Sequence, residues 1–132
     1  MHATGTFAVK ITPAEASALG QAAGLGSMTI DKTFSGDLEA TSKGEMLTAS
    51  TESTGAMAYV AMERVTGKLK GRSGSFLLMH NASMLKTDPK SGVLQVMVVP
   101  HSGTDELTGL SGNMTITIES GKHSYDLEYQ LP

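Results

Sequence analysis

The chain has 132 residues and a formal net charge of −3, so it fits one domain and lacks the basic character usual in nucleic-acid-binding proteins. Hydrophobic residues make up 39% and charged residues 17% of the chain, a balance that excludes intrinsic disorder. Cysteine is absent, which excludes disulfides and thiolate-based metal or catalytic sites.

The chain shows no membrane or export signal. It contains no apolar stretch of the roughly 20 residues that a membrane-spanning helix needs. It also lacks a basic start followed by an apolar stretch and a small-residue cleavage site. We therefore expect a single domain over residues 1–132, located in the cytoplasm, without a nucleic-acid or membrane partner.

The first predicted elements are a strand and a short helix. Phe7, Val9 and Ile11 alternate with more polar neighbours, which predicts a strand over residues 4–11. The next four residues, Thr-Pro-Ala-Glu, fit a capping box with proline at the first helical position, which predicts a helix over residues 13–19. The Gly/Ala-rich segment 21–27 is expected to be a flexible lid or crossover.

Seven more strands follow, because the apolar period stays at two and turn residues recur at short intervals. We place them near 28–40, 45–52, 57–67, 73–83, 92–100, 111–119 and 123–131, with one turn at Ser42-Lys43-Gly44 and a second helical turn near 104–107. A meander of eight strands leaves two exposed edges unless its first and last strands pair. The sequence therefore predicts an all-β, closed eight-stranded antiparallel barrel, with a sandwich as the alternative.

Three groups of residues resemble a known family when they are taken together. They are 33–39 (TFSGDLE), 63–76 (ERVTGKLKGRSGSF) with His80, and 98–112 (VVPHSGTDELTGLSG). In this order they resemble the uncharacterised bacterial family "domain of unknown function 3224" (DUF3224), over about residues 3–131. The resemblance implies a barrel similar to that of allene oxide cyclase and implies no established activity. Allene oxide cyclase uses a cavity cysteine that this chain lacks, and segment 14–27 is less polar than is usual in the family.

Several polar residues share the apolar side of their strands and are candidates for the barrel interior, or lumen. They are Lys32, Arg64, His80 and Gln95. A buried charge is costly unless it is paired, so the lysine and the arginine each need a carboxylate such as Glu63. Because adjacent strand residues point to opposite faces, either Glu63 or Arg64 lies inside, and the sequence leaves this open.

The candidate ligand-binding residues are therefore Lys32, Tyr59, Glu63, Arg64, His80, Gln95 and Tyr125, with the two tyrosines at the edges of the lumen. Lys32 or Arg64 would hold an anionic group, and Glu63 would orient that cation or move a proton. Glu63 and His80 are the weak catalytic candidates. The four histidines form no cluster with metal-ligand spacing, so we expect neither a metal nor a cofactor.

Three functional hypotheses follow from this pattern. The favoured one is a barrel that binds a small apolar or amphipathic molecule, in keeping with nine methionines and few aromatic residues. The alternatives are an isomerase- or cyclase-type enzyme acting in the cavity, and a solid structural barrel. Two stretches, 75–79 and 93–99, are apolar on both faces. Either Leu77 and Met79, or Leu94, Val96 and Val98, are therefore expected outside the barrel, in a homodimer or higher homo-oligomer, with cover by the helix at 13–19 as the alternative.

Overall fold

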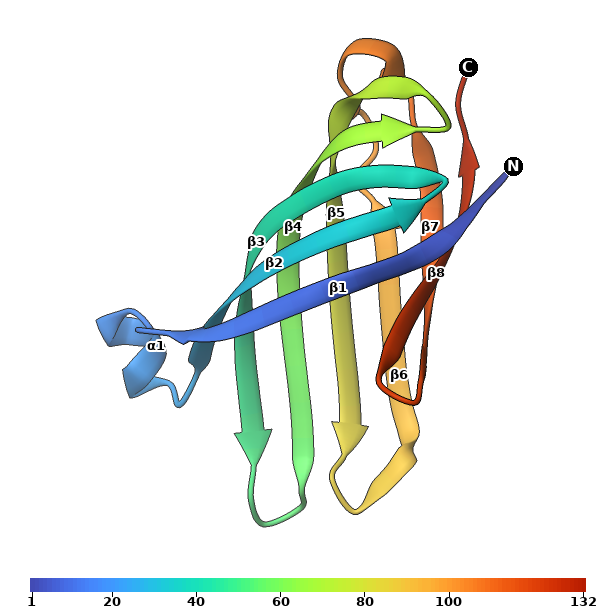
Figure 1. Ribbon diagram of the computed structural model, residues 1–132. Helices are drawn as coiled ribbons and strands as arrows, with labels where there is room; N and C mark the ends of the chain where they lie inside the picture. The colour runs from blue at the N-terminus through green and yellow to red at the C-terminus, as the bar shows by residue number, and fades with distance from the viewer.

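Alternation of apolar and polar residues produces eight strands in the computed structural model, which describes residues 1–132 (Figure 1). The strands are β1 (His2–Ala14), β2 (Gly26–Gly36), β3 (Leu38–Thr51), β4 (Ala56–Leu69), β5 (Arg72–Leu85), β6 (Asp88–Val98), β7 (Ser111–Glu119) and β8 (Lys122–Gln130). Each pairs antiparallel with the next, and β1 also pairs with β8. The predicted closed meander barrel is therefore confirmed, and the sandwich alternative is wrong.

Two short helices interrupt the strands, α1 (Ala18–Ala22) and the 3-10 helix η1 (Asp105–Leu107). The first begins five residues later than predicted, because Pro13 and Ala14 still pair with β2 as part of β1. Ser17 caps the helix instead, and its hydroxyl accepts a hydrogen bond from the Gly20 amide. Neither helix is long and apolar enough to cross a membrane.

The turn between β2 and β3 lies earlier than predicted. It occurs at Gly36 and Asp37, where Gly36 adopts a φ of +104° and Asp37 is bonded to Thr4 of β1 through both its amide and its carboxylate. The predicted turn at residues 42–44 is instead continuous strand. Gly44 lies opposite Glu63 there, and a Cβ at this glycine would collide with the backbone of β4. Its missing side chain lets the two strands approach closely.

One end of the barrel is packed solid. Leu107 and Leu110, from the loop between β6 and β7, are each 1% exposed and join the main apolar core. The loop is tied to β5 because the Thr104 amide donates to the Ser75 carbonyl oxygen. This loop and the strands around it close one end of the lumen.

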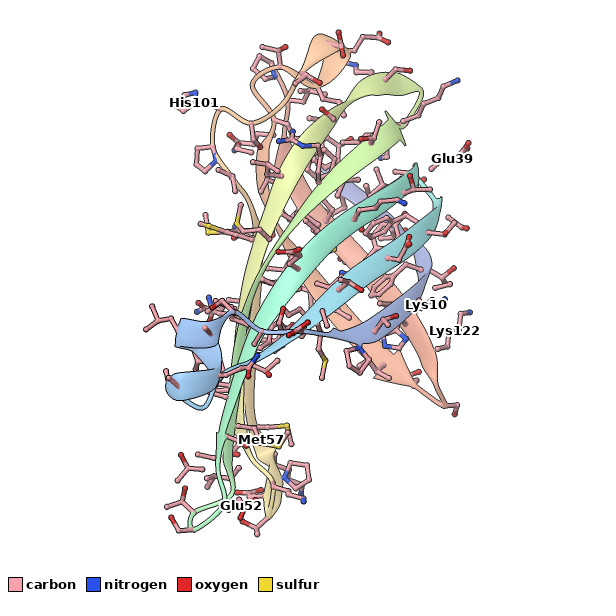
Figure 2. The ribbon with its side chains drawn as sticks, turned by 90° about the vertical axis from the view of Figure 1, so that its left-hand side faces the viewer. Lys10, Glu39, Glu52, Met57, His101 and Lys122 are labelled. Carbon is pink, nitrogen blue, oxygen red and sulfur yellow. The ribbon has the colours of Figure 1, made fainter.

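The other end is open. Strands β6 and β7 pair only at Val96–Met114 and Met97–Asn113, so residues 88–95 of β6 have no partner on that side. The β3–β4 and β5–β6 hairpins extend beyond the rest of the barrel (Figure 1). Figure 2 labels Met57 within this extension. Strands β1, β2, β7 and β8 do not reach as far, so they leave the inner face of the extension uncovered (Figure 1).

Candidate functional site

Strand β4 decides which polar residues enter the lumen. Ala61, Glu63 and Val65 are buried and face inward, whereas Val60 and Arg64 are exposed on the outer face. The alternative that the sequence left open is thereby resolved in favour of Glu63. The interior thus receives a carboxylate from β4 rather than a guanidinium.

Glu63 lies at the centre of a buried polar cluster. Lys32 Nζ of β2 donates to Glu63 Oε2 at 2.9 Å, and Ser42 Oγ of β3 donates to Oε1 at 2.7 Å. Both charged side chains are almost fully buried, so each satisfies the other in a region from which water is excluded. The ammonium group also lies 4.9 Å from the ring centroid of Phe7, close enough for a cation–π contact.

His80 and Tyr59 continue the cluster toward the open end. His80 Nε2 of β5 lies 2.8 Å from Glu63 Oε2, and the Tyr59 hydroxyl of β4 lies 3.0 Å from His80 Nδ1. The two rings meet edge to face, with centroids 5.4 Å apart. The result is a continuous hydrogen-bonded chain from Lys32 through Glu63 and His80 to Tyr59.

The cluster sets the charge of Glu63. Burial by itself raises the pKa of this carboxyl, but the hydrogen bond from His80, the charge and hydrogen bond of Lys32 and the hydrogen bond from Ser42 outweigh burial and lower the pKa to about 2. Burial, and then the Glu63 charge, raise the pKa of the Tyr59 hydroxyl. At neutral pH the site therefore contains a carboxylate and a protonated phenol.

An apolar cavity of about 780 Å³ begins where the cluster ends. Tyr59 lines it together with Met28, Met46, Met57 and Met84, and it extends to the inner face of the β3–β6 extension and the segment after α1. Its volume falls in the range of about 300–1,000 Å³ that is typical of small-molecule sites. None of its lining residues is charged.

Three predicted site residues lie elsewhere. Arg64 and Gln95 point outward and are exposed, so their expected placement in the lumen is wrong. The alternation in β6 places Leu94, Val96 and Val98 inside instead, so that alternative is wrong, and Leu77 and Met79 of β5 are the ones on the outer face. Tyr125 is buried at the closed end, where its hydroxyl accepts from the Leu38 amide and donates to the Ser35 carbonyl oxygen.

Sequence reasoning missed Ser42, because the Ser-Lys-Gly triplet resembles a turn. Its even spacing from Leu38, Ala40 and Met46, which are all inward residues of β3, is the signal that could have identified it. Four of the seven predicted binding residues, Lys32, Tyr59, Glu63 and His80, do meet in one place. No group of three or more His, Cys, Asp or Glu side chains is gathered as a metal site would require.

Comparisons with known proteins agree with this fold. Residues 3–129 match the family model described as "Protein of unknown function (DUF3224)". The chain is also similar to the crystal structure of a DUF3224-family protein of unknown function from Shewanella oneidensis MR-1, with 49% identity and a TM-score of 0.88, over 100% of this chain and 98% of the other. No curated protein matches the chain.

Proposed function

The chain belongs to the DUF3224 family, which carries no assigned function, and from its own geometry we propose that it binds a small apolar molecule in the open end of the barrel. The observation that supports this proposal is the cavity of about 780 Å³ with methionine-rich walls and one chain of buried polar groups at its inner end. Apolar walls with few polar groups are typical of ligand sites.

The shape of the barrel supports binding rather than a solid interior. Leu107 and Leu110 fill the closed end, whereas no comparable plug fills the open end. Methionine side chains are flexible and polarizable, so a wall made of them adapts to ligands of different shape. An apolar cavity wall favours an apolar ligand, because binding removes both the wall and the ligand from contact with water.

A neutral fluorescent probe, N-phenyl-1-naphthylamine, tests the proposal. We expect saturable fluorescence enhancement with one probe per chain and a rise in the unfolding midpoint on binding. Ala82→Phe inserts a ring into the cavity wall and should weaken binding at least tenfold. Asn81→Phe, one residue away on the outer face, is the matched control and should leave binding unchanged.

Two results would count against the proposal. One is fluorescence that rises without saturation, which indicates non-specific surface binding and leaves a structural barrel as the better description. The other is an equal loss of binding in Ala82→Phe and Asn81→Phe, which would place the probe outside the cavity.

One observation favours isomerase-type catalysis as a second candidate. The phenol of Tyr59, the imidazole of His80 and the carboxylate of Glu63 form a hydrogen-bonded series of the kind that moves protons in general acid–base catalysis. This candidate requires that a ligand be chemically altered during incubation and that His80→Ala prevent the alteration. Recovery of every bound ligand unchanged would contradict it.

A further inference from the structure

The proposed cavity offers no free positive charge to a ligand, and the inference that follows rests on that proposed function. Lys32 is the cation inside the barrel, and its ammonium group is already paired with Glu63. Arg64 points outward, and no charged side chain lines the cavity. A carboxylate or phosphate group would lose its hydration there without gaining a counter-ion, which is strongly unfavourable.

The hydrogen-bonded chain has a single arrangement of protons when the His80 imidazole is neutral. Glu63 Oε2 is an ionised acceptor, so His80 Nε2, at 2.8 Å, must carry a hydrogen. In a neutral imidazole the other nitrogen, Nδ1, is then an acceptor. The Tyr59 hydroxyl, at 3.0 Å from Nδ1, consequently donates its single hydrogen to His80.

Tyr59 therefore has only acceptor capacity left for a molecule in the cavity. The other inward hydroxyls of the cavity wall belong to Thr48 and Ser50, and these groups can rotate to donate or accept. They do not discriminate between a donor and an acceptor on the ligand. Tyr59 does, because its donor is committed to His80.

We propose that the cavity selects an uncharged, mainly apolar alcohol, whose hydroxyl group donates a hydrogen bond to the Tyr59 phenol oxygen while its apolar part lies against the methionine-rich wall. Glu63 and His80 act as positioning residues, since they set the direction of the Tyr59 hydrogen bond without touching the ligand. The ligand class is thus a neutral hydroxylated lipid-like molecule rather than a fatty acid.

Three probes with the same ten-carbon chain separate the head-group chemistries. 1-Decanol donates a hydrogen bond, decyl methyl ether only accepts, and decanoate carries a negative charge. Measured by displacement of N-phenyl-1-naphthylamine at pH 7.5, decanol should bind about fivefold more tightly than the ether, which corresponds to one neutral hydrogen bond. Decanoate should bind more weakly than both.

Tyr59→Phe removes the acceptor and should abolish the preference for decanol over the ether. Tyr129→Phe at the closed end is the matched control, because it removes a phenol remote from the cavity and should preserve the preference. Equal affinities in the wild type, or a preference for the ether or decanoate, would overturn the alcohol inference while leaving the binding function intact. Failure of every ten-carbon probe and of the fluorescent probe would overturn both.

The proton positions can be measured without a ligand. Long-range ¹H–¹⁵N NMR of the His80 ring should show the neutral tautomer with hydrogen on Nε2. A hydrogen on Nδ1, in either the other tautomer or the imidazolium, would free the Tyr59 hydrogen to face the cavity. That result would overturn the inference even if Tyr59→Phe failed to fold.

Discussion

Glu63 shows how one residue combines stability with a defined chemical state. Three donors surround its carboxylate, from Lys32, Ser42 and His80, and no buried side-chain polar atom is left without a partner. Such a cluster is favourable only when it is complete, because a buried charge that loses its partner keeps its desolvation cost. The same completeness directs the Tyr59 hydroxyl toward His80, so the interior network also determines what the cavity offers to a ligand.

The low pKa of Glu63 predicts how stability depends on pH. Its pKa is about 2 in the folded protein against 4.5 ordinarily, so its contribution is fully present above about pH 4.5 and is lost as the pH falls toward 2. A difference of this size corresponds to about 3 kcal/mol. In urea unfolding, the wild type should exceed Glu63→Gln in free energy of unfolding by about 3–5 kcal/mol at pH 7, and this difference should become smaller below pH 4.5.

The wild type and Glu63→Gln contain the same other carboxylates, so the difference between the two proteins reports on Glu63 alone. A difference in unfolding free energy that stays constant from pH 7 to pH 2.5 would contradict the low pKa of Glu63. If Glu63→Gln does not fold, ¹³C NMR titration of the Glu63 carboxyl carbon in the wild type gives the same answer. A midpoint near 4.5 would then show that the cluster does not stabilise the ionised form.

Strand β3 is the element in which local sequence misleads most. Ser42, Lys43 and Gly44 have turn-forming character, yet all three pair with both β2 and β4. The true turn at Gly36 and Asp37 is held by Thr4, more than 30 residues away in the chain. A contact between distant segments cannot be deduced from the local pattern, so the turn and the inward position of Ser42 were missed together.

A test of this element is the close approach of β3 to β4. Gly44→Ala adds a Cβ that would collide with the backbone at Met62 and Glu63, so we expect a loss of unfolding free energy of about 1–3 kcal/mol. Gly92→Ala is the matched control, because its nearest neighbour would be the Pro89 carbonyl oxygen at 3.3 Å and a small shift relieves it. Equal losses in the two variants would show that close approach at Gly44 is not required.

Alternation with a period of two correctly predicted the barrel and the inward positions of Lys32 and His80, because a strand with one buried face repeats every second residue. It left open whether Glu63 or Arg64 enters the lumen. It failed in β6, where Val93 and Leu94 are both apolar and the period gives no preferred face. Leu94 faces inward there, and Gln95 is consequently on the outside. The cavity itself could not be predicted, since it depends on how far neighbouring strands extend beyond one another.

At the scale of the whole molecule, the barrel interior consists of three successive layers. The apolar core that includes Leu107 fills the closed end, the Glu63 cluster crosses the middle, and the cavity occupies the open end. The polar layer is fully hydrogen-bonded and lies between two apolar ones. The closed end thereby supports the cluster, and the cluster in turn fixes the inner end of the cavity.

The outer face carries an apolar patch, which we define as Leu47, Val60, Met62 and Met79 on β3, β4 and β5. Leu47 pairs with Val60 and Met62 pairs with Met79, so these side chains are neighbours on one face, and they are 37–56% exposed. The rim of the patch carries both signs of charge, at Glu45 and Arg64. A two-fold interface is self-complementary, and a rim of mixed charge suits a second copy of the chain better than a rim of one charge.

We therefore expect a homodimer formed through this patch, with a light-scattering mass twice that of one chain. Met79→Lys places a charge within the patch and should yield a monomer, because an unpaired lysine would be desolvated in the interface. Thr33→Lys, an exposed outward position on β2, is the control and should remain dimeric. A wild-type mass equal to one chain would contradict the dimer, and a dimer that persists in Met79→Lys would place the interface elsewhere. Because the patch and the cavity lie on opposite faces of the same strands, dimer formation would leave the open end accessible to a ligand.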